Sequence, residues 1–420
     1  MLKDSEEAGQ AVQDISDWLV DQGLAGSGIE ALFQGFCERL VQAGIPIWRA
    51  HLTMSTLHPM FEAVSQNWYR NGGAETENIR HGASIKGAWQ QSPLRHMIEE
   101  RAFEFRRQLE KPDCALDFPV LEEFKDRGGT DYLALMTTFS GDPDDLEQAD
   151  GMIVSWTSDR EGGFSAKDVE ALRRLQRRFS LSLKIAQREQ VAENVVSAYL
   201  GADAGKRVLA GQIRRGDGQN IHAVIWFCDL RDSTVLADKL PRAEFLSILN
   251  DFFDCMAGAV LAHGGEVLRF IGDAALAIFP TDIDDESGSL LRSPASCCSS
   301  EEACQAAVAA ANEAMDRMAA LNQGRAEKDE PPLEYGLALH MGDVTYGNIG
   351  VPGRLEFTVI GAAANEAARL EGLCKKLKVP ALISEEFKRC FPGPLVSLGV
   401  HSFRGVETAQ EVFTIPMAQS

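Results

Sequence analysis

Two apolar segments in the second half of the chain each run into an aspartate, and this feature constrains the fold most. The segments cover residues 225–234 (IWFCDLRDST) and 268–279 (LRFIGDAALAIF), and the aspartates are Asp229 and Asp273. Apolar runs of this length are typical of buried strands, so the pattern predicts a carboxylate at the end of each of two strands. Converging carboxylates can bind hard divalent cations such as Mg²⁺, and paired ions of this kind hold and activate triphosphates. The pair indicates nucleotide chemistry, although a helix cap or a turn residue explains either aspartate alone.

Length and composition place the chain among globular proteins. Its 420 residues predict two or three domains, and 45% hydrophobic with 25% charged residues argue against a disordered or fibrous chain. The formal charge of −21 argues against a nucleic-acid surface, which needs clustered lysine and arginine. The 9 cysteines lack metal-binding spacing and are expected to be reduced thiols. Acids stand where a signal peptide needs a basic start, and no apolar run reaches membrane-spanning length, so we expect a cytoplasmic protein with no membrane contact.

The N-terminal part predicts a mixed α+β regulatory domain over residues 28–164, after a helical extension of residues 1–27. Helical spacing covers residues 29–44 and a helix is expected at 118–129, while strand-like segments are at 48–55, 60–70, 131–139 and 151–159. No phosphate loop and no His/Cys/Asp cluster occurs in it, which favours a sensor or dimerisation unit over an enzyme. The order of elements resembles a GAF-type sensory domain, and an undefined α+β domain is the alternative.

A connecting helix and linker are predicted over residues 165–218. Ser165 can cap the helix, and Val169, Leu172, Leu175 and Phe179 recur at helical spacing. A helix that ran to about Leu200 would span ~50 Å at ~1.5 Å per residue. Its apolar stripe either pairs with a second copy as a coiled coil or packs on its own N-terminal domain.

The C-terminal domain is predicted over residues 219–420 and reads as β-α-β-β-α-β, the ferredoxin-like plan. A central strand is followed by a helix after Pro241, and then by a hairpin that turns at Gly272 and Asp273. A low-complexity loop at 280–300 precedes an alanine-rich helix at 301–321. Residues 333–350 predict a second hairpin, and residues 356–373 predict a strand that runs into a helix.

Four of these segments together resemble the catalytic domain of class III nucleotidyl cyclases, over residues 221–416. They are FCDLRDST, RFIGDAALAIF, LALHMGDVTYGNIG and EFTVIGAAANEAARLE, in which Thr358, Asn365 and Arg369 keep the spacing of the family. The resemblance implies an adenylate cyclase that converts ATP to 3′,5′-cyclic AMP and pyrophosphate with two Mg²⁺ or Mn²⁺ ions per site. It also implies a homodimer in which each active site is shared between two subunits.

The resemblance assigns a role to each candidate residue. Asp229 and Asp273 become the metal ligands, Asn365 orients the ribose, and Arg369 stabilises charge on the α-phosphate. Asn365 and Arg369 are i and i+4 on one helix face, and a planar guanidinium suits a phosphoryl oxygen, so physical chemistry agrees. Substrate contacts are expected from a base-selecting pair, from the segment after Asp229 and from one C-terminal arginine: Arg269, Thr358, Leu230, Arg231, Ser233, Thr234 and Arg404. The backbone N–H groups of residues 230–234 would face the phosphates.

Two departures from the family keep alternatives open. Arg269 stands where adenylyl cyclases usually have lysine; Arg can still donate to adenine N1, and the Thr358 hydroxyl can accept from the N6 amine. Asp232 and Ser233 replace a Gly-Phe pair, and the added carboxylate would repel a triphosphate unless it turns away. The alternatives are a catalytically weak or dead domain that binds nucleotide, a cyclase that prefers GTP, and a diguanylate cyclase, against which the missing GGDEF-type signature weighs.

The input signal is not named by the sequence. If Arg269, Thr358, Asn365 and Arg369 complete the site of a partner subunit, dimer geometry controls turnover, and the connecting helix can transmit a small-molecule or protein signal from the N-terminal domain. His222, His263 and His340 form no matched cluster with carboxylates and are expected in core or surface roles.

Overall fold

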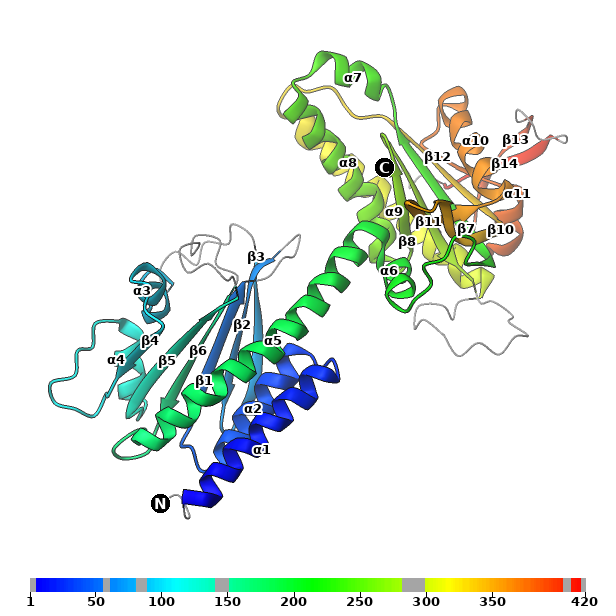
Figure 1. The fold of residues 1–420 in the computed structure, drawn as a ribbon. Coiled ribbons are helices and arrows are strands. Elements are labelled where there is room, and N and C mark those ends of the chain that lie inside the picture. The colour runs from blue at the N-terminus through cyan, green and yellow to red at the C-terminus, as the bar shows by residue number, and fades with distance from the viewer. Residues whose placement is uncertain are drawn as a thin grey trace. The chain divides into compact units, whose positions relative to one another are not determined.

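The computed structural model describes residues 5–55, 61–80, 89–139, 151–281, 299–402 and 409–416. The chain divides into two compact units, Met1–Val195 and Val196–Ser420 (Figure 1). Each unit has its own sheet and its own hydrophobic core.

The first unit is built on a six-stranded antiparallel sheet with the order β3-β2-β1-β6-β5-β4. Its strands are β1 (Arg49–Ser55), β2 (Phe61–Tyr69), β3 (Gly73–Arg80), β4 (Glu104–Arg107), β5 (Asp131–Thr138) and β6 (Gly151–Ser158). Its helices are α1 (Ser5–Leu24), α2 (Ile29–Gln42), α3 (Pro93–Glu99), α4 (Pro119–Asp126) and most of α5 (Ala166–Leu200).

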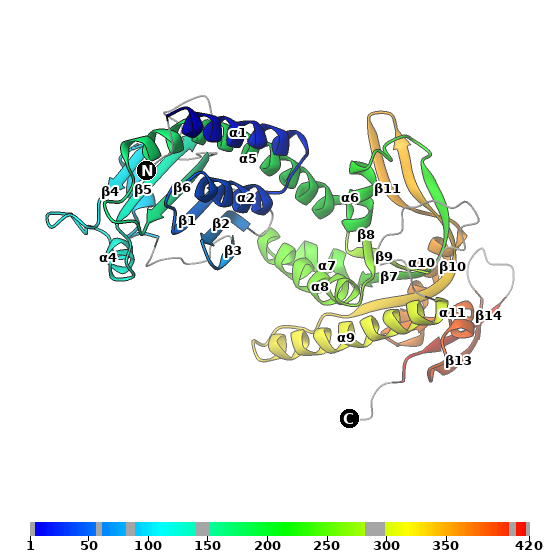
Figure 2. The ribbon, with the colours of Figure 1, turned by 90° about the horizontal axis from the view of Figure 1, so that it is seen from below.

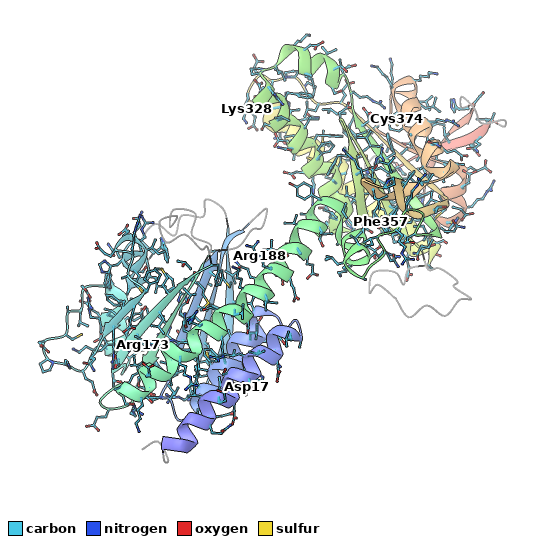
Figure 3. The ribbon with its side chains drawn as sticks, viewed as in Figure 1. Asp17, Arg173, Arg188, Lys328, Phe357 and Cys374 are labelled. Carbon is cyan, nitrogen blue, oxygen red and sulfur yellow. The ribbon has the colours of Figure 1, made fainter. Side chains whose placement is uncertain are left out.

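Helices α1, α2 and α5 cover one face of this sheet, and α3 and α4 lie on the other (Figures 1 and 2). The larger core stacks Phe36 on Phe179 with ring centroids 4.3 Å apart, and Trp156 meets Phe36 edge-on. On the surface of α5, Arg173 reaches strand β4 and bonds the carboxylate of Glu104 at 2.7 Å (Figure 3). These ring contacts connect α5 to α2, and α2 to strand β6 of the sheet.

The predicted elements of this unit match the structure at α2, α4, β1, β2, β5 and β6. The helix after Ser165 is also confirmed, because Ser165 Oγ accepts the N–H of Asp168 and Asp168 Oδ2 accepts the N–H of Ser165. It continues unbroken to Leu200. Strands β3 and β4 and helix α3 were not predicted, because these short polar segments carry no periodic signal. The resemblance to a GAF domain and the coiled coil stay predictions.

The second unit holds an eight-stranded sheet with the order β13-β14-β12-β10-β7-β9-β8, and β11 pairs with β10. The strands are β7 (Gly218–Leu230), β8 (Glu266–Ile271), β9 (Ala274–Pro280), β10 (Tyr335–Val351), β11 (Arg354–Ile360), β12 (Ala381–Ile383), β13 (Val396–His401) and β14 (Gln410–Thr414). The helices are α6 (Ala202–Leu209), α7 (Ser233–Lys239), α8 (Arg242–Ala262), α9 (Ser300–Ala326), α10 (Ala362–Leu377) and α11 (Glu385–Cys390).

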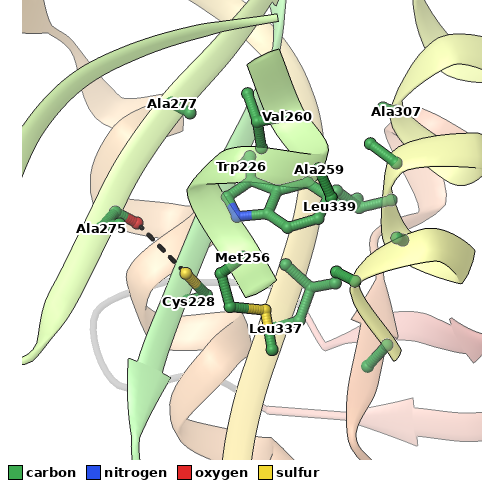
Figure 4. Packing of buried hydrophobic residues seen from close by; sticks show 14 of the residues in the cluster. Trp226, Cys228, Met256, Ala259, Val260, Ala275, Ala277, Ala307, Leu337 and Leu339 are labelled. Carbon is green, nitrogen blue, oxygen red and sulfur yellow. Dashed lines mark hydrogen bonds between the residues drawn. The ribbon is translucent and has the colours of Figure 1, made fainter. Parts of the chain in front are cut away.

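Strand β7 lies between β10 and β9, and both of its faces are buried. This burial explains its unbroken apolar run. Trp226, Cys228 and Leu230 face the core under α8 and α9, where Trp226 lies among Met256, Leu337 and Leu339 (Figure 4). The alternate residues, such as Ala223 and Ile225, face α6 and α10 together with Phe357 of β11. Asp229 has the parity of this second set, so it projects toward the α10 side of the sheet.

Two expectations for this unit were wrong. Residues 333–350 do not form a hairpin: β10 is a single strand whose pairing with β7 runs from Tyr335 opposite Leu230 to Gly347 opposite Gly218. The partner strand satisfies the backbone through Gly342, so no turn forms there, and the chain reverses later, between Val351 and Arg354. Second, residues 202–209 of the expected linker form helix α6, whose Ala204 is buried against the sheet.

Helix α8 is long and apolar enough by composition to cross a membrane, unlike what the sequence analysis expected. Its Phe252, Met256 and Val260 are buried in the core of the second unit. Packing against the sheet accounts for these residues, whereas Leu246 and Leu261 of the same helix are exposed.

Candidate active site

The two aspartates meet at one end of the sheet. Strands β7 and β9 pair with Asp229 opposite Ala274, the residue that follows Asp273, and Leu230 donates its N–H to the carbonyl of Asp273 at 3.3 Å. The β8–β9 hairpin turns at Gly272, whose φ of 66° lies in the left-handed region that favours glycine. The predicted hairpin is confirmed, and it brings the second aspartate beside the end of the central strand.

The electrostatics of this pair favour a bound cation. Burial raises the pKa of the Asp229 carboxyl, and the charge of Asp273 raises it further, while Arg231 opposes the rise. Among the described residues, no side chain makes an ion pair or hydrogen bond to either carboxylate. A divalent cation would remove the repulsion between the two carboxylates and would offset part of the free-energy cost of burying their charges.

The donor set fits Mg²⁺ or Mn²⁺ better than a cation that needs a full protein cage. The described part of the chain contains no group of three or more His, Cys, Asp or Glu that could hold a metal. Magnesium commonly uses one or two carboxylates and completes its shell with water and substrate phosphates. Asp229 and Asp273 supply that minimum.

The segment after Asp229 is less open to phosphate than the sequence predicted. The N–H of Leu230 is bonded to Asp273, the N–H of Arg231 donates to the carbonyl of Glu334 at 2.8 Å, and the Leu230 side chain is core. These two amides are therefore not free in this structure. Ser233 and Thr234 open the short helix α7 and remain the candidates of this segment for a substrate contact.

Asp232 forms an ion pair with a lysine of α10. Its backbone is left-handed, with φ 53° and ψ 26°, and its side chain bonds Lys375 Nζ of α10 at 3.1 Å. Both side chains of this ion pair are exposed. Lys375 therefore offsets the charge of the Asp232 carboxylate, which the sequence analysis expected to oppose a triphosphate.

A buried ion pair beside the aspartates was missed by the sequence analysis. Arg231 bonds Glu371 of α10, and the two side chains are only 14% and 6% exposed. Burial raises the pKa of Glu371 to about 7 even though Arg231 opposes the shift, and the charges of Asp229 and Asp273 add to it. No local pattern marks this pair, because its partners are 140 positions apart.

The two candidate base-selecting residues lie on β8, which pairs with β9, and on β11, which pairs with β10. Arg269 of β8 donates through Nη1 to Glu356 of β11 at 2.9 Å, and Glu356 shares a face of β11 with Thr358 because side chains alternate along a strand. Thr358 is 3% exposed, and its hydroxyl has no hydrogen-bond partner among the described residues. Such a buried hydroxyl is a group that a ligand can satisfy. Glu356 is a third polar residue here that the sequence analysis missed.

Asn365 and Arg369 lie on the exposed side of α10. The opposite side of this helix packs on the sheet through Ala363 and Ala367, and its buried residues include Glu371. Arg369 and Glu371 are about 200° apart around a helix of ~3.6 residues per turn. The body of α10 therefore separates Asn365 and Arg369 from the aspartate pair of the same chain.

The remaining candidates fall outside a common site. Arg404 lies outside the described residues. His222 contacts Asp343 at 2.6 Å, His263 contacts Glu313 at 2.7 Å, and the buried His340 contacts Ser384 at 2.9 Å. His340 also lies 3.4 Å from Glu366 and 3.8 Å from Glu386, so each of the three histidines has a carboxylate partner, which the sequence analysis did not expect.

Comparison with known proteins bears on the second unit. Residues 218–401 match the family model of the adenylate and guanylate cyclase catalytic domain. An uncharacterised protein of Mycobacterium tuberculosis is 31% identical over 234 residues, which are 54% of this chain and 38% of that protein. The adenylate cyclase of Anabaena cylindrica is 31% identical over 178 residues, which are 42% of this chain and 32% of that enzyme.

Among solved structures, the adenylyl cyclase CyaB from P. aeruginosa has a TM-score of 0.42 at 24% identity, over 48% of this chain and 97% of that chain. The chain spans only about two fifths or less of the length of the curated relatives it matches, from 38% down to 32%. The order of strands and helices in the second unit, the four segments quoted above and the family match agree. Residues 218–401 therefore form a catalytic domain of the class III adenylate and guanylate cyclase family.

Proposed function

We propose that this protein is an adenylate cyclase that converts ATP to 3′,5′-cyclic AMP and pyrophosphate at a site shared between two copies of the chain. The observation that carries the proposal is the division of the candidate residues by α10. Asp229 and Asp273 lie near Glu371, a residue of the buried side of this helix, whereas Asn365 and Arg369 lie on its exposed side. A second chain that presents its own exposed α10 face to the aspartates would complete the site.

The proposed chemistry assigns one task to each group. Asp229 and Asp273 would hold Mg²⁺ or Mn²⁺, which when bound supplies activation of the ribose 3′-hydroxyl and neutralises the triphosphate. Asn365 from the partner chain would orient the ribose, since its amide both donates and accepts. Arg369 from the partner would donate to the α-phosphate oxygens, where charge develops as the pyrophosphate leaves.

The choice of ATP is supported by the hydrogen-bonding chemistry of Arg269 and Thr358. A guanidinium has only donors and can donate to adenine N1, while the threonine hydroxyl can accept from the adenine N6 amine. Glu356 holds Arg269 at 2.9 Å and so limits the positions from which it donates. The position of Glu356 beside Arg269 also supports GTP as the second candidate, because the Glu356 carboxylate could accept from guanine N1–H and N2–H.

A nucleotide-binding domain without turnover is the other alternative. The carboxylate of Asp232 favoured this alternative, and its ion pair with Lys375 weakens that support. We also retain the proposal that residues 28–164 regulate the domain through α5, that the ligand or partner sensed there is unidentified, and that the protein acts in the cytoplasm, where ATP is available.

A mixture of ATP, GTP, CTP and UTP with Mn²⁺ tests the proposed function on the full chain. Chromatography of the products should give cyclic AMP as the main cyclic nucleotide. Cyclic GMP as the main product would move the proposal to its second candidate. Absence of any cyclic nucleotide, in a preparation that binds Mn²⁺ and ATP, would favour the binding domain.

A further inference from the structure

We propose that Glu371 is a positioning residue that holds the guanidinium of Arg231 away from Asp229, so that Asp229 and Asp273 stay available to divalent cations. This inference deepens the proposed function and rests on its assignment of the two aspartates as metal ligands. It concerns the Arg231–Glu371 ion pair.

Arg231 is placed where it could pair with Asp229. Arg231 follows the last residue of β7, two positions after Asp229, and its Nη2 lies against Gly336, the residue opposite Asp229 in the β10–β7 register. Arg231 is also close enough to Asp229 to oppose the rise in its pKa. An unrestrained arginine at this position would compete with a metal ion for the Asp229 carboxylate.

Glu371 removes that competition by binding Arg231 from α10. Arg231 Nη2 also donates to the backbone carbonyl of Glu371 at 3.1 Å, so the guanidinium contacts both the carboxylate and the backbone of one residue. The pair lies over Gly336, which is opposite Asp229 in the β10–β7 register. A Cβ at Gly336 would collide with both Arg231 Nη2 and Glu371 Oε1, so this close approach requires glycine.

Burial makes the loss of one partner of this ion pair more costly than the loss of one partner of a surface ion pair. The side chains of Arg231 and Glu371 are 14% and 6% exposed, whereas those of Lys375 and Asp232 are 68% and 63% exposed. Both pairs connect α10 to the same segment after β7. Loss of one partner of a buried pair leaves an uncompensated charge, while an exposed pair is screened by water. Lys375→Ala is therefore a matched control for Glu371→Gln.

The test is Mn²⁺ binding by the full chain without nucleotide, measured by electron paramagnetic resonance. Asp273→Asn identifies the signal that belongs to this site, because it should remove it. Glu371→Gln should weaken Mn²⁺ binding about tenfold or more, since the Arg231 guanidinium would then be free to pair with the carboxylate of Asp229. The double variant Arg231→Met with Glu371→Gln should recover the affinity to within about threefold, because the competing charge is gone.

Two further variants keep the proposal falsifiable if Glu371→Gln unfolds, which thermal unfolding would reveal. Arg231→Met alone should bind Mn²⁺ at least as tightly as the parent, and Lys375→Ala should stay within about twofold. Parent-like affinity in folded Glu371→Gln, a double variant no tighter than Glu371→Gln, or a weak Arg231→Met would each overturn the proposal.

The nucleotide mixture assay separates this inference from the proposed function. If the parent makes no cyclic nucleotide but the Mn²⁺ pattern holds, the role of Glu371 stands and the cyclase assignment fails. If the parent makes cyclic AMP while Glu371→Gln keeps its Mn²⁺ affinity, the cyclase assignment stands and the role of Glu371 fails.

Discussion

Asp131 in the first unit and Asp229 in the second are both carboxylates at the end of a sheet strand, yet their surroundings differ. Asp131 is fully buried, and it accepts two bonds from Arg106, the shorter of 2.6 Å, and one from the N–H of Phe164. Asp229 is only partly buried and faces a second carboxylate, Asp273. The first unit therefore neutralises its buried acid with an arginine of the same unit, whereas the second unit places two acids close enough to raise the pKa of Asp229.

The largest expected effect comes from removing one of the uncompensated acids. Asp273→Ala should lower cyclic AMP formation by roughly a thousandfold or more, because a metal ligand that acts on the reacting oxygens is lost. Thermal unfolding without metal should change little, since a repulsive contact disappears with the side chain. A variant that keeps more than a tenth of the parent rate would show that Asp273 is not a metal ligand.

The next effect is on stability, and it should be opposite in the two units. Asp131→Asn should lower the free energy of unfolding by about 3 kcal/mol, because it leaves Arg106 partly buried without its counter-charge. Asp229→Asn should leave it unchanged or raise it by about 0.5 kcal/mol, because repulsion with Asp273 ends. Chemical denaturation of both variants without metal measures the difference, and equal losses would remove the distinction between the two acids.

The acids of the second unit should make the stability of the metal-free protein depend on pH. Burial raises the pKa of Asp229 and raises that of Glu371 to about 7, so the folded metal-free protein holds these protons more tightly than the unfolded chain. The contribution of Glu371 to stability is therefore present at low pH and is lost as pH rises through about 7, and the raised pKa of Asp229 acts in the same direction.

Mn²⁺ should compensate for this loss by binding the ionised carboxylates. The rise in melting temperature on adding Mn²⁺ should be larger at pH 8 than at pH 6, and Asp273→Asn should reduce it at both. Scanning calorimetry gives both values. A rise that is larger at pH 6 would contradict the raised pKa of the site.

The smallest effect is expected where the ion pair is exposed. Glu356→Gln should change stability by less than about 0.5 kcal/mol, because Arg269 and Glu356 are accessible to water. It should raise the KM for ATP several-fold with little change in kcat, since Arg269 would be less well placed. A selective loss of GTP turnover would show instead that Glu356 contacts guanine directly.

The sequence predicted what depends on local signals. The turn at Gly272 and Asp273, the cap at Ser165 and the buried run of β7 are each set by neighbouring residues, and all three are present. The partners of the site were not predictable in this way. Glu371 and Glu356 meet Arg231 and Arg269 only because separate elements come together in the fold.

At strand β10, a local signal predicted a turn that the structure does not contain. Gly342 and Asp343 carry a turn signal, and tertiary pairing with β7 overrides it. Contacts between distant parts of the chain also explain why the amides of Leu230 and Arg231 do not face phosphate as expected. Their partners, Asp273 and Glu334, come from other parts of the chain.

The most direct test of the shared site mixes two inactive variants, Asp273→Ala and Arg369→Ala. In a heterodimer, one site would take its aspartates from one chain and its α10 residues from the other, and would be intact. Random mixing should restore roughly a quarter of the parent rate, since about half the dimers carry one intact site of two. Continued inactivity in heterodimers isolated through two different tags would contradict a site shared between chains.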